Sequence, residues 1–283
     1  RDLSVDDIRV LTKKMSDAMK VSEKYADYII NYPPQALFQK KKFILGLAVS
    51  LPMATNQINK EKNNSICLNR ENIIILHSPS SPLDKGTNIV RRIIKSLQKK
   101  KYKIKYIEII NKTHAEVLEN IQNCDFVIDQ VYSDTPMAVF ATEAASYGKP
   151  AVVGGYYSEY IYSEINKKFI PPSEYVLPEC MEAAVVKLIE NKKYRLKLGK
   201  QAQDYVRLYC NPKKVAERYI DIINNDIPED WWFNPDNIEY FYGYGYNKDD
   251  VRKRIIDLIH DNKFDDLCLS NHLQRKLLST LNK

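Results

Sequence analysis

Between residues 72 and 177 the sequence alternates short apolar runs with amphipathic segments, and this alternation limits the fold more than any other feature. The apolar runs have the length of buried strands and lie at residues 73–76, 102–110, 126–129, 151–153 and 175–177. Helical periodicity separates or follows them at residues 87–99, 113–122, 136–147, 181–191, 193–209 and 213–224. Connections of roughly two to ten residues between strand and helix are typical of a parallel sheet that helices cover on both faces. The sequence therefore predicts an α/β fold for this part of the chain.

The segments on either side have a different character. Helices are expected at residues 5–25, 248–260 and 271–281, a short strand at 27–31 and a polar linker at 56–71. After residue 226 aromatic side chains become dense, in Trp231, Trp232, Phe233 and the run IEYFYGYGY. We therefore divide the chain into residues 1–71, 72–225 and 226–283. Because the chain begins at Arg1, we expect a fragment or a processed product.

Composition excludes several classes of protein. A hydrophobic content of 44% excludes a disordered chain. The longest apolar run, residues 43–51, is about half the length that spans a bilayer and lies too far from the N-terminus for a signal peptide. The 5 cysteines form no C-x-x-C pair, so neither a zinc site nor a disulfide framework is indicated, and a reducing cytoplasm is expected. No metal cluster and no D-x-D pair is visible, so no metal site is predicted.

The net charge of +7 is densest at Lys99, Lys100 and Lys101, which Lys103 and Lys105 follow. These lysines lie where a predicted helix ends, so a solvated turn that complements the helix C-terminus is the simplest interpretation. The alternative is attraction to an anionic membrane surface, which would place the protein at the inner face of the membrane. Nucleic-acid binding ranks last, because no recognised motif accompanies the charge.

The loop HSPSSPLDKGT, residues 77–87, joins the first strand of the alternating region to its helix. Lys85 lies just ahead of the helix, where its ammonium and the backbone N–H groups can share an anion. Gly86 lets the backbone approach a ligand closely. The order K-G-T is not a Walker motif, and no G-x-G-x-x-G occurs, so a dinucleotide dehydrogenase is disfavoured. An ordinary surface lysine is the alternative interpretation of Lys85.

The segment DTPMAVFATEAASYGKP follows the strand at residues 126–129 and predicts a short helix with a polar entry. Asp134 or Thr135 is expected to cap this helix, Pro136 to occupy its first turn and Gly148 to end it in a left-handed conformation. A polar loop that leads from the carboxyl end of a strand into a helix N-terminus is where open α/β sheets bind anionic ligands. The segment therefore predicts a nucleotide-type site.

Three further side chains near these loops have chemistry of their own. Glu143 lies among small or apolar residues on the short helix, where a carboxylate is costly to bury without partners. It is either a solvent-facing glutamate or an acceptor for a vicinal diol, since a carboxylate takes two hydroxyl hydrogen bonds. His77 and His114 lie near neighbouring strand–helix junctions. Each is a candidate donor to phosphate or sugar, and a structural or exposed histidine is the alternative.

Four stretches resemble the C-terminal, donor-binding domain of retaining glycosyltransferases with the GT-B fold: ILHSPSSPLDKGT, HAEVLENIQNCDFVIDQ, TPMAVFATEAASYGKPAVV and ECMEAAVVKLIENKKYRLKLG. The resemblance covers about residues 72–223, and ADYIINYPP is similar to the last strand of the partner N-terminal domain. It implies a Rossmann-like parallel sheet with helices on both faces for residues 72–225. It further implies a remnant of the N-terminal domain with a linker at 1–71 and an aromatic, helical extension at 226–283.

Carried onto this sequence, the resemblance implies that Glu143 binds the ribose hydroxyls of a donor nucleotide and that Lys85 neutralises its diphosphate. The backbone amides of Ala138 and Val139 would cradle the diphosphate at the helix start. The expected donor-binding set is completed by Gly86, Thr87, Asp134, Thr135, His77 and Ser80.

The sequence departs from the family's pattern in this set. The first acidic position of the family signature falls on Thr135, with Asp134 adjacent, and the usual loop arginine corresponds to Ser80. Two glycines of the signature fall on Pro136 and Ala138. We expect donor binding to survive these changes better than full activity does.

The implied activity is transfer of a hexose from a nucleotide-diphosphate sugar to a glycan or glycolipid acceptor, with retention and without a metal or other cofactor. Catalysis in this family is largely stabilisation of the diphosphate leaving group. Most of the acceptor-binding half is missing from these 283 residues, so an N-terminal-domain partner is expected. The alternatives are a catalytically impaired module that serves protein association and a sugar-nucleotide epimerase. The aromatic segment after Trp231 is expected to be a packing strap that returns to the missing domain, with a carbohydrate-stacking surface as the alternative.

Overall fold

The structure is a computed structural model that describes residues 4–53, 71–243, 245–259 and 267–281. The predicted linker at 56–71 lies outside the described residues except for Glu71. The chain divides into two compact units, one formed by Arg1–Val49 with Ile220–Lys283 and the other by Ser50–Tyr219. The first unit joins two segments that the sequence division had kept apart. Among the described residues, no helix is both long and apolar enough to cross a membrane.

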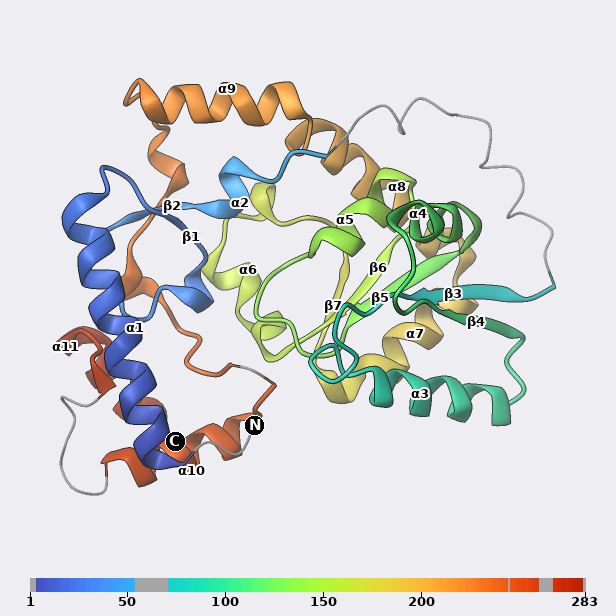
Figure 1. Cartoon of the computed structure of the whole chain (residues 1–283). Coiled ribbons are helices and arrows are strands. Elements are labelled where there is room, and N and C mark those ends of the chain that lie inside the picture. Colours follow the sequence, from blue (N-terminus) through green and yellow to red (C-terminus); the bar gives the residue numbers. More distant parts are fainter. Residues whose placement is uncertain (1–3, 54–70, 244, 260–266, 282–283) are drawn as a thin grey trace. The chain divides into compact units, whose positions relative to one another are not determined.

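The larger unit is built on a sheet of 5 parallel strands in the order β4-β3-β5-β6-β7 (Figure 1). The strands are β3 (Ile73–His77), β4 (Ile104–Glu108), β5 (Phe126–Gln130), β6 (Ala151–Gly154) and β7 (Glu174–Val176). The central strand β5 is buried along its whole length. The predicted α/β fold with a parallel sheet is therefore confirmed.

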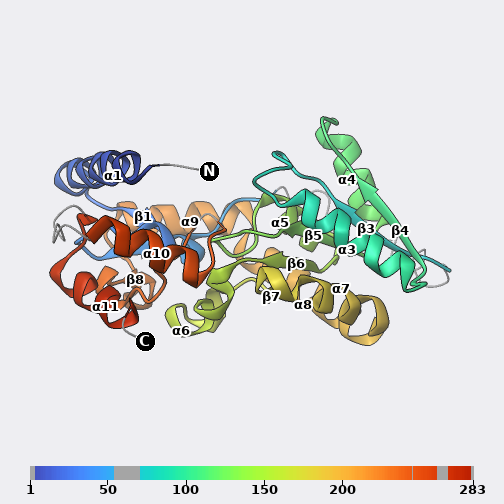
Figure 2. The same cartoon turned by 90° about the horizontal axis from the view of Figure 1, so that it is seen from below.

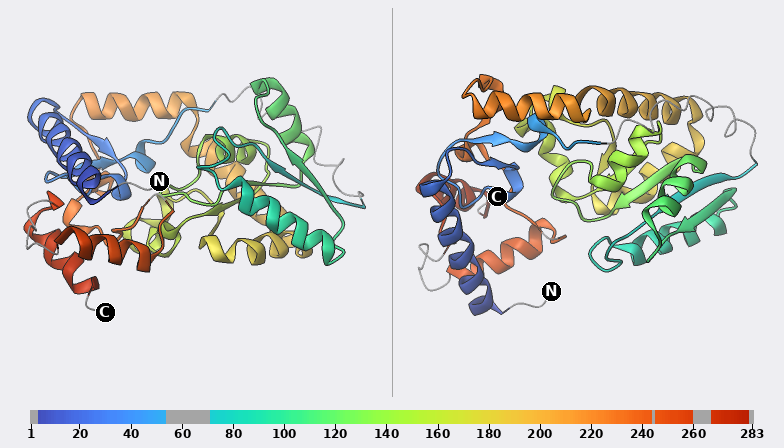
Figure 3. Two further views of the ribbon diagram at one scale, coloured as in Figure 1. Left: turned by 60° about the horizontal axis from the view of Figure 1, so that its bottom comes forward. Right: turned by 45° about the horizontal axis from the view of Figure 1, so that its top comes forward.

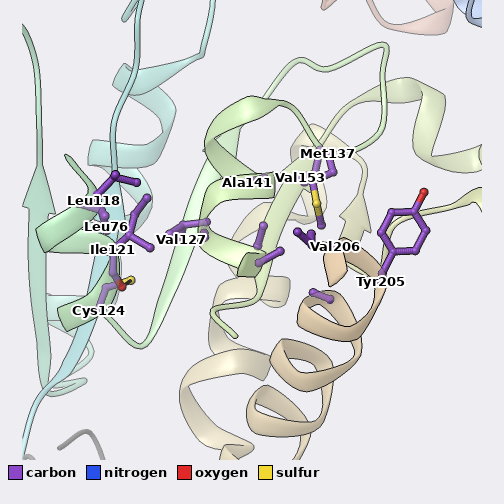
Figure 4. Close-up of a cluster of buried hydrophobic side chains, with 14 of the residues drawn as sticks. Leu76, Leu118, Ile121, Cys124, Val127, Met137, Ala141, Val153, Tyr205 and Val206 are labelled. Atoms are coloured by element: carbon purple, nitrogen blue, oxygen red, sulfur yellow. Dashed lines mark hydrogen bonds between the residues drawn. The ribbon is translucent and has the colours of Figure 1, made fainter. Parts of the chain in front are cut away.

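Helices cover both faces of this sheet, as Figures 2 and 3 show from other directions. One face packs against α3 (Thr87–Lys99) and α7 (Met181–Glu190), and the other against α4 (His114–Asn123), α5 (Val139–Ser146) and α8 (Lys192–Tyr209). On the second face the core combines strand, helix and loop side chains (Figure 4), which include Leu76, Leu118, Ile121, Val127, Met137, Ala141, Val153, Tyr205 and Val206. The larger unit also contains the short helix α6 (Ile161–Glu164), and its boundary with the smaller unit falls within α9 (Pro212–Ile223).

The position of β4 at the edge of the sheet gives a structural reason for the lysines that cluster around residues 99–105. Lys101, Lys103 and Lys105 are exposed beside or on this strand, and charged side chains on an edge discourage pairing with another sheet. Lys103 forms an ion pair with Glu71, with 2.5 Å between Nζ and Oε1. These contacts support a solvated edge, and the membrane interpretation stays a prediction.

The start of α5 differs from the prediction. The helix begins at Val139 with Ala138 as its N-cap and no side-chain cap, so capping by Asp134 or Thr135 is wrong. Ser133 is the reason, because its hydroxyl donates to the Thr135 carbonyl at 2.5 Å and accepts from the Thr135 N–H at 3.3 Å. This local turn holds the chain out of helical geometry. The helix ends as predicted, with Gly148 at a φ of 72°.

The smaller unit joins both ends of the chain through a second sheet. β2 (Phe43–Leu45) pairs in parallel with β1 (Ile30–Asn31) and antiparallel with β8 (Trp232–Phe233). Strand pairing between segments far apart in sequence is the physical reason that these segments share one unit. Its other described helices are α1 (Val5–Tyr25), α2 (Gly46–Val49), α10 (Lys248–Ile259) and α11 (Asn271–Leu281).

The aromatic segment packs inside this smaller unit. Trp231 is 8% exposed, Tyr240 is fully buried, and the Phe233 ring packs against that of Phe43 in a tilted arrangement with 5.3 Å between ring centroids. Buried aromatic rings contribute large apolar contact areas. Trp231, Phe233 and Tyr240 are therefore core residues, which favours the packing interpretation over a carbohydrate-stacking surface.

Helix α8 approaches the end of α5 so closely that only glycine fits. A Cβ on Gly199 would lie 2.1 Å from the carbonyl oxygen of Gly148. We expect Gly199→Ala to destabilise the protein by about 2 kcal/mol, because overpacking outweighs the gain of about 1 kcal/mol that alanine brings to a helix. Thermal melting of Gly199→Ala measures the effect, and Lys200→Ala on the exposed side of α8 is the control. A melting temperature at or above that of the unsubstituted protein would contradict this packing.

Candidate functional site

The strand order places a topological switch point between β3 and β5. The chain passes from β3 outward to β4 and then returns across the sheet to β5, on the other side of β3. In open α/β sheets, ligands bind in the crevice outside the carboxyl ends of the two strands that flank such a point. The loops that leave these two ends are residues 78–86 and 131–138. They are the two loops that the sequence predicted to bind an anion.

These two loops lie in direct contact. The Val131 N–H donates to the Lys85 carbonyl at 3.1 Å. A Cβ on Gly86 would lie 2.7 Å from the Val131 Cβ, and Gly86 has a φ of 70°, which favours glycine. Gly86 is therefore needed both for its backbone conformation and for the close approach of the loops.

The Lys85 ammonium is held at the carboxyl end of β5. Its Nζ donates to Gln130 Oε1 at 2.6 Å, and Gln130 Nε2 in turn donates to the Ser133 hydroxyl at 2.7 Å. Lys85 itself is half-buried, whereas Ser80 of the same loop is exposed. The chain of hydrogen bonds fixes one positive charge at the junction of the loops. The predicted contact of Lys85 with a diphosphate stays a prediction.

A buried carboxylate lies beside this ammonium, and sequence reasoning missed it. Asp129, the fourth residue of β5, is 2% exposed, and the backbone N–H of Ala138 hydrogen-bonds its carboxylate. Its Oδ2 has no hydrogen-bond partner within the described residues. Burial raises the pKa of Asp129 to about 6, although the Lys85 charge and the Ala138 N–H offset part of the rise. The sequence did contain a signal for this residue, because Asp129 is the acidic last residue of an otherwise apolar predicted strand at 126–129.

Asp129 also changes the expected role of the α5 N-terminus. Of the two amides predicted to cradle a diphosphate, that of Ala138 already bonds a carboxylate. Val139 opens the helix with a side chain that is 55% exposed. The cradle at Ala138 and Val139 stays a prediction, and at Ala138 a ligand would share the N–H with Asp129.

The structure brings Glu143 and His114 together. His114 Nε2 and Glu143 Oε1 are 2.6 Å apart, and the contact joins α5 to the first residue of α4. The Glu143 side chain is only 13% exposed, whereas that of His114 is 67% exposed. Thr113 caps α4 and so fixes the position of His114. The carboxylate is therefore oriented by one partner and open to solvent on that side.

His77 and Thr87 support the site from within the core. Both are fully buried, His77 Nδ1 donates to the Ile128 carbonyl at 2.8 Å, and Nε2 accepts from the Thr87 hydroxyl at 3.0 Å. This assignment follows because a carbonyl only accepts. Burial lowers the pKa of His77, so the neutral ring is favoured. The expectation that His77 and Thr87 contact a ligand is corrected, because their polar atoms pair with each other and the sheet.

Thr135 lies at a small pocket next to these loops. The pocket, of about 10 Å³, is lined also by Pro136, Gly155, Tyr157 and Tyr175, and its volume is about that needed for one water molecule. A hexose does not fit into this space as the loops stand. Asp134 and Thr135 are both half-buried. Within the described ranges, no three His, Cys, Asp or Glu side chains are grouped to hold a metal ion.

The buried charge of Asp129 predicts a specific pH dependence of stability. The pKa of Asp129 in the folded protein is about 6, above the ordinary 3.8. The contribution of this raised pKa to the stability of the fold is therefore complete below pH 3.8 and is lost as the pH rises through about 6. We expect Asp129→Asn to be more stable than the unsubstituted protein at pH 8, by at most about 3 kcal/mol, and to lose this advantage near pH 4. Melting temperatures between pH 4 and pH 8 measure the difference. Asp84→Asn, on the exposed loop, is the control and should show no such trend.

No protein-family model and no curated protein matches the sequence. Among solved structures, the chain is similar to S. aureus TarM, solved with fondaparinux, alpha-GlcNAc-glycerol and UDP (12% identity, 54% of this chain and 36% of that one, TM-score 0.41). It is also similar to Anabaena HepE with UDP and glucose (15%, 78% and 67%, TM-score 0.46) and to sucrose-phosphate synthase from Thermosynechococcus elongatus (14%, 79% and 62%, TM-score 0.48). These proteins are glycosyltransferases of the GT-B class. The chain thus spans 36% to 67% of their length. Similarity at TM-scores below 0.5 gives no information about the chemistry of its site.

Proposed function

We propose that this chain binds a nucleotide-diphosphate sugar at the switch point of its larger unit and serves as a glycosyltransferase or its donor-binding half. The observation that carries the proposal is the packed junction of the two loops, where the Lys85 ammonium is fixed by Gln130 at 2.6 Å. A fixed cation at the carboxyl edge of a parallel sheet suits an anionic ligand. The proposed donor delivers a hexose to a glycan or glycolipid acceptor.

Lys85 supplies the positive charge for the diphosphate in this proposal. An ammonium in a half-buried loop acts in a lower effective dielectric than one in open solvent, so its attraction for an anion is stronger. During transfer the diphosphate leaves with its electron pair, and negative charge grows on its oxygens. A cation placed beforehand at that position stabilises the leaving group more than it stabilises the bound donor.

Glu143 supplies the site for the ribose. Its carboxylate has two oxygens, and the contact with His114 at 2.6 Å engages Oε1. A carboxylate accepts several hydrogen bonds, so acceptor capacity remains for a vicinal diol. Its partner His114 is the first residue of α4, the helix that follows β4, so this acceptor lies toward the carboxyl ends of the strands, where the loop with Lys85 also begins.

Retention at the anomeric carbon and independence from metal ions are parts of the same proposal, and they rest on the sequence resemblance alone. So does the expectation of a partner that supplies the acceptor half, for which no interface is assigned. Contact with an anionic membrane surface and a cytoplasmic location belong to the proposal in the same way. A chain that only serves protein association would be indifferent to changes in Lys85 and Glu143, which separates that alternative experimentally.

The role of Lys85 is tested by calorimetric titration with UDP, GDP, CDP and ADP. We expect one of these nucleotides to bind, and Lys85→Ala to weaken its binding by about tenfold to one hundredfold, because a charged hydrogen bond to phosphate is lost. Lys95→Ala, an exposed lysine on α3, should leave the affinity within about twofold. Absence of heat with all four nucleotides on folded protein would remove the proposed function.

The role of Glu143 is tested by comparing the bound nucleoside diphosphate with its 2′-deoxy form. The unsubstituted protein should prefer the ribose form by about tenfold, since its 2′-hydroxyl donates to the carboxylate. Glu143→Ala should abolish this preference, whereas Glu119→Ala on the exposed side of α4 should keep it. An equal preference in both variants would exclude Glu143 from the ribose site.

A further inference from the structure

Asp129 places a negative charge next to the position where the proposed function requires an anionic ligand to bind. The residue is 2% exposed, and its carboxylate accepts from the Ala138 N–H at the start of α5. The second oxygen, Oδ2, has no partner among the residues that the structure describes. A buried ionised carboxylate is normally paired or hydrogen-bonded at both oxygens. Asp129 therefore has one oxygen at which a proton is readily accommodated.

The groups around Asp129 come from three elements and contribute little charge. Lys85, in the loop before α3, attracts the carboxylate and is the positive group among them. Ala138 contributes only a backbone N–H from α5. Tyr175 on β7 also feels the Asp129 charge, and its hydroxyl donates to the Pro171 carbonyl at 2.7 Å. Burial is thus the main influence on the charge of Asp129, and the Lys85 ammonium, which the proposed ligand would use, is the main group that opposes it and favours the ionised state.

We propose that binding of a nucleotide diphosphate at the Lys85 loop is coupled to the uptake of one proton by Asp129. This inference rests on the proposed function, because it requires an anion at Lys85. The proton comes from solvent and goes to a carboxylate oxygen, with Oδ2 as the unpartnered position. The carboxyl group becomes neutral, and no other bond forms or breaks.

Two effects act in the same direction when the anion binds. The diphosphate engages the Lys85 ammonium and weakens its attraction for Asp129, and the diphosphate also adds negative charge near the carboxylate. Both effects favour the protonated form. Because burial already raises the pKa of Asp129 to about 6, a further rise of about one or two units carries its titration across neutral pH.

The test is titration calorimetry of the whole chain with UDP-glucose at pH 7.5, in buffers with different ionisation enthalpies. The diphosphate of UDP-glucose is esterified at both ends and does not itself titrate near neutral pH. If UDP-glucose is silent, GDP-mannose and ADP-glucose take its place. We expect uptake of about 0.2 to 0.7 proton per bound ligand at pH 7.5, and an affinity that falls by up to about sixfold per pH unit between pH 6.5 and 8.

Two variants assign the proton to its site. Asp129→Asn keeps the size of the side chain and should bind the nucleotide sugar without proton uptake, with an affinity at pH 8 about tenfold above that of the unsubstituted protein. Asp84→Asn removes an exposed carboxylate from the same loop and should leave the uptake unchanged. His114→Gln removes the exposed histidine that contacts Glu143 and should also keep the uptake.

The outcomes separate this inference from the proposed function. Binding with no proton uptake, or uptake that disappears in His114→Gln and persists in Asp129→Asn, overturns the role of Asp129 and leaves the nucleotide site intact. Absence of binding by all three nucleotide sugars overturns both. The buffer series on the unsubstituted protein decides the coupling even if Asp129→Asn fails to fold.

Discussion

The site depends on one constraint, the pairing of β3 with both β4 and β5 in a parallel sheet. This pairing forces the loops that leave the carboxyl ends of β3 and β5 to meet, because the chain must cross the sheet between them. The hydrogen bond from the Val131 N–H to the Lys85 carbonyl and the lack of room at Gly86 make the junction tightly packed. Backbone contacts therefore position the two loops, the side-chain hydrogen bonds through Gln130 hold the Lys85 ammonium, and the hydrogen bond between His77 and Thr87 joins β3 to the start of α3.

The charge balance at this junction distinguishes it from a purely basic anion site. Lys85 contributes a positive charge, and Asp129 contributes a buried carboxylate that also accepts a hydrogen bond from the Ala138 N–H. In a low-dielectric setting the two charges influence each other strongly. Any anion that engages Lys85 must therefore change the electrostatic environment of Asp129 as well. The Glu143–His114 contact lies farther along α5, where His114 is open to solvent.

Local signals in the sequence predicted most of the elements. The bounds expected for α1, α3 and α11 agree with the structure, because their periodicity and ends are local features. The start of α5 was wrong by three residues, since the Ser133 hydroxyl forms a turn with Thr135 that competes with helical geometry. The short strands β2 and β8 were not predicted. Strands of two or three residues carry too little pattern to be distinguished from other apolar segments.

By itself, the sequence determined the α/β class, the alternation of strand and helix, the loop with Lys85 and the loop that leads into the helix with Glu143. Periodicity, turn residues and capping are encoded within a few neighbouring positions, so they can be read without the fold. The tertiary structure alone decided that Asp129 lies buried under the start of α5, that His114 meets Glu143, and that the two ends of the chain share one unit. Each of these contacts joins residues from different elements, so strand pairing and packing determine them and the local pattern does not.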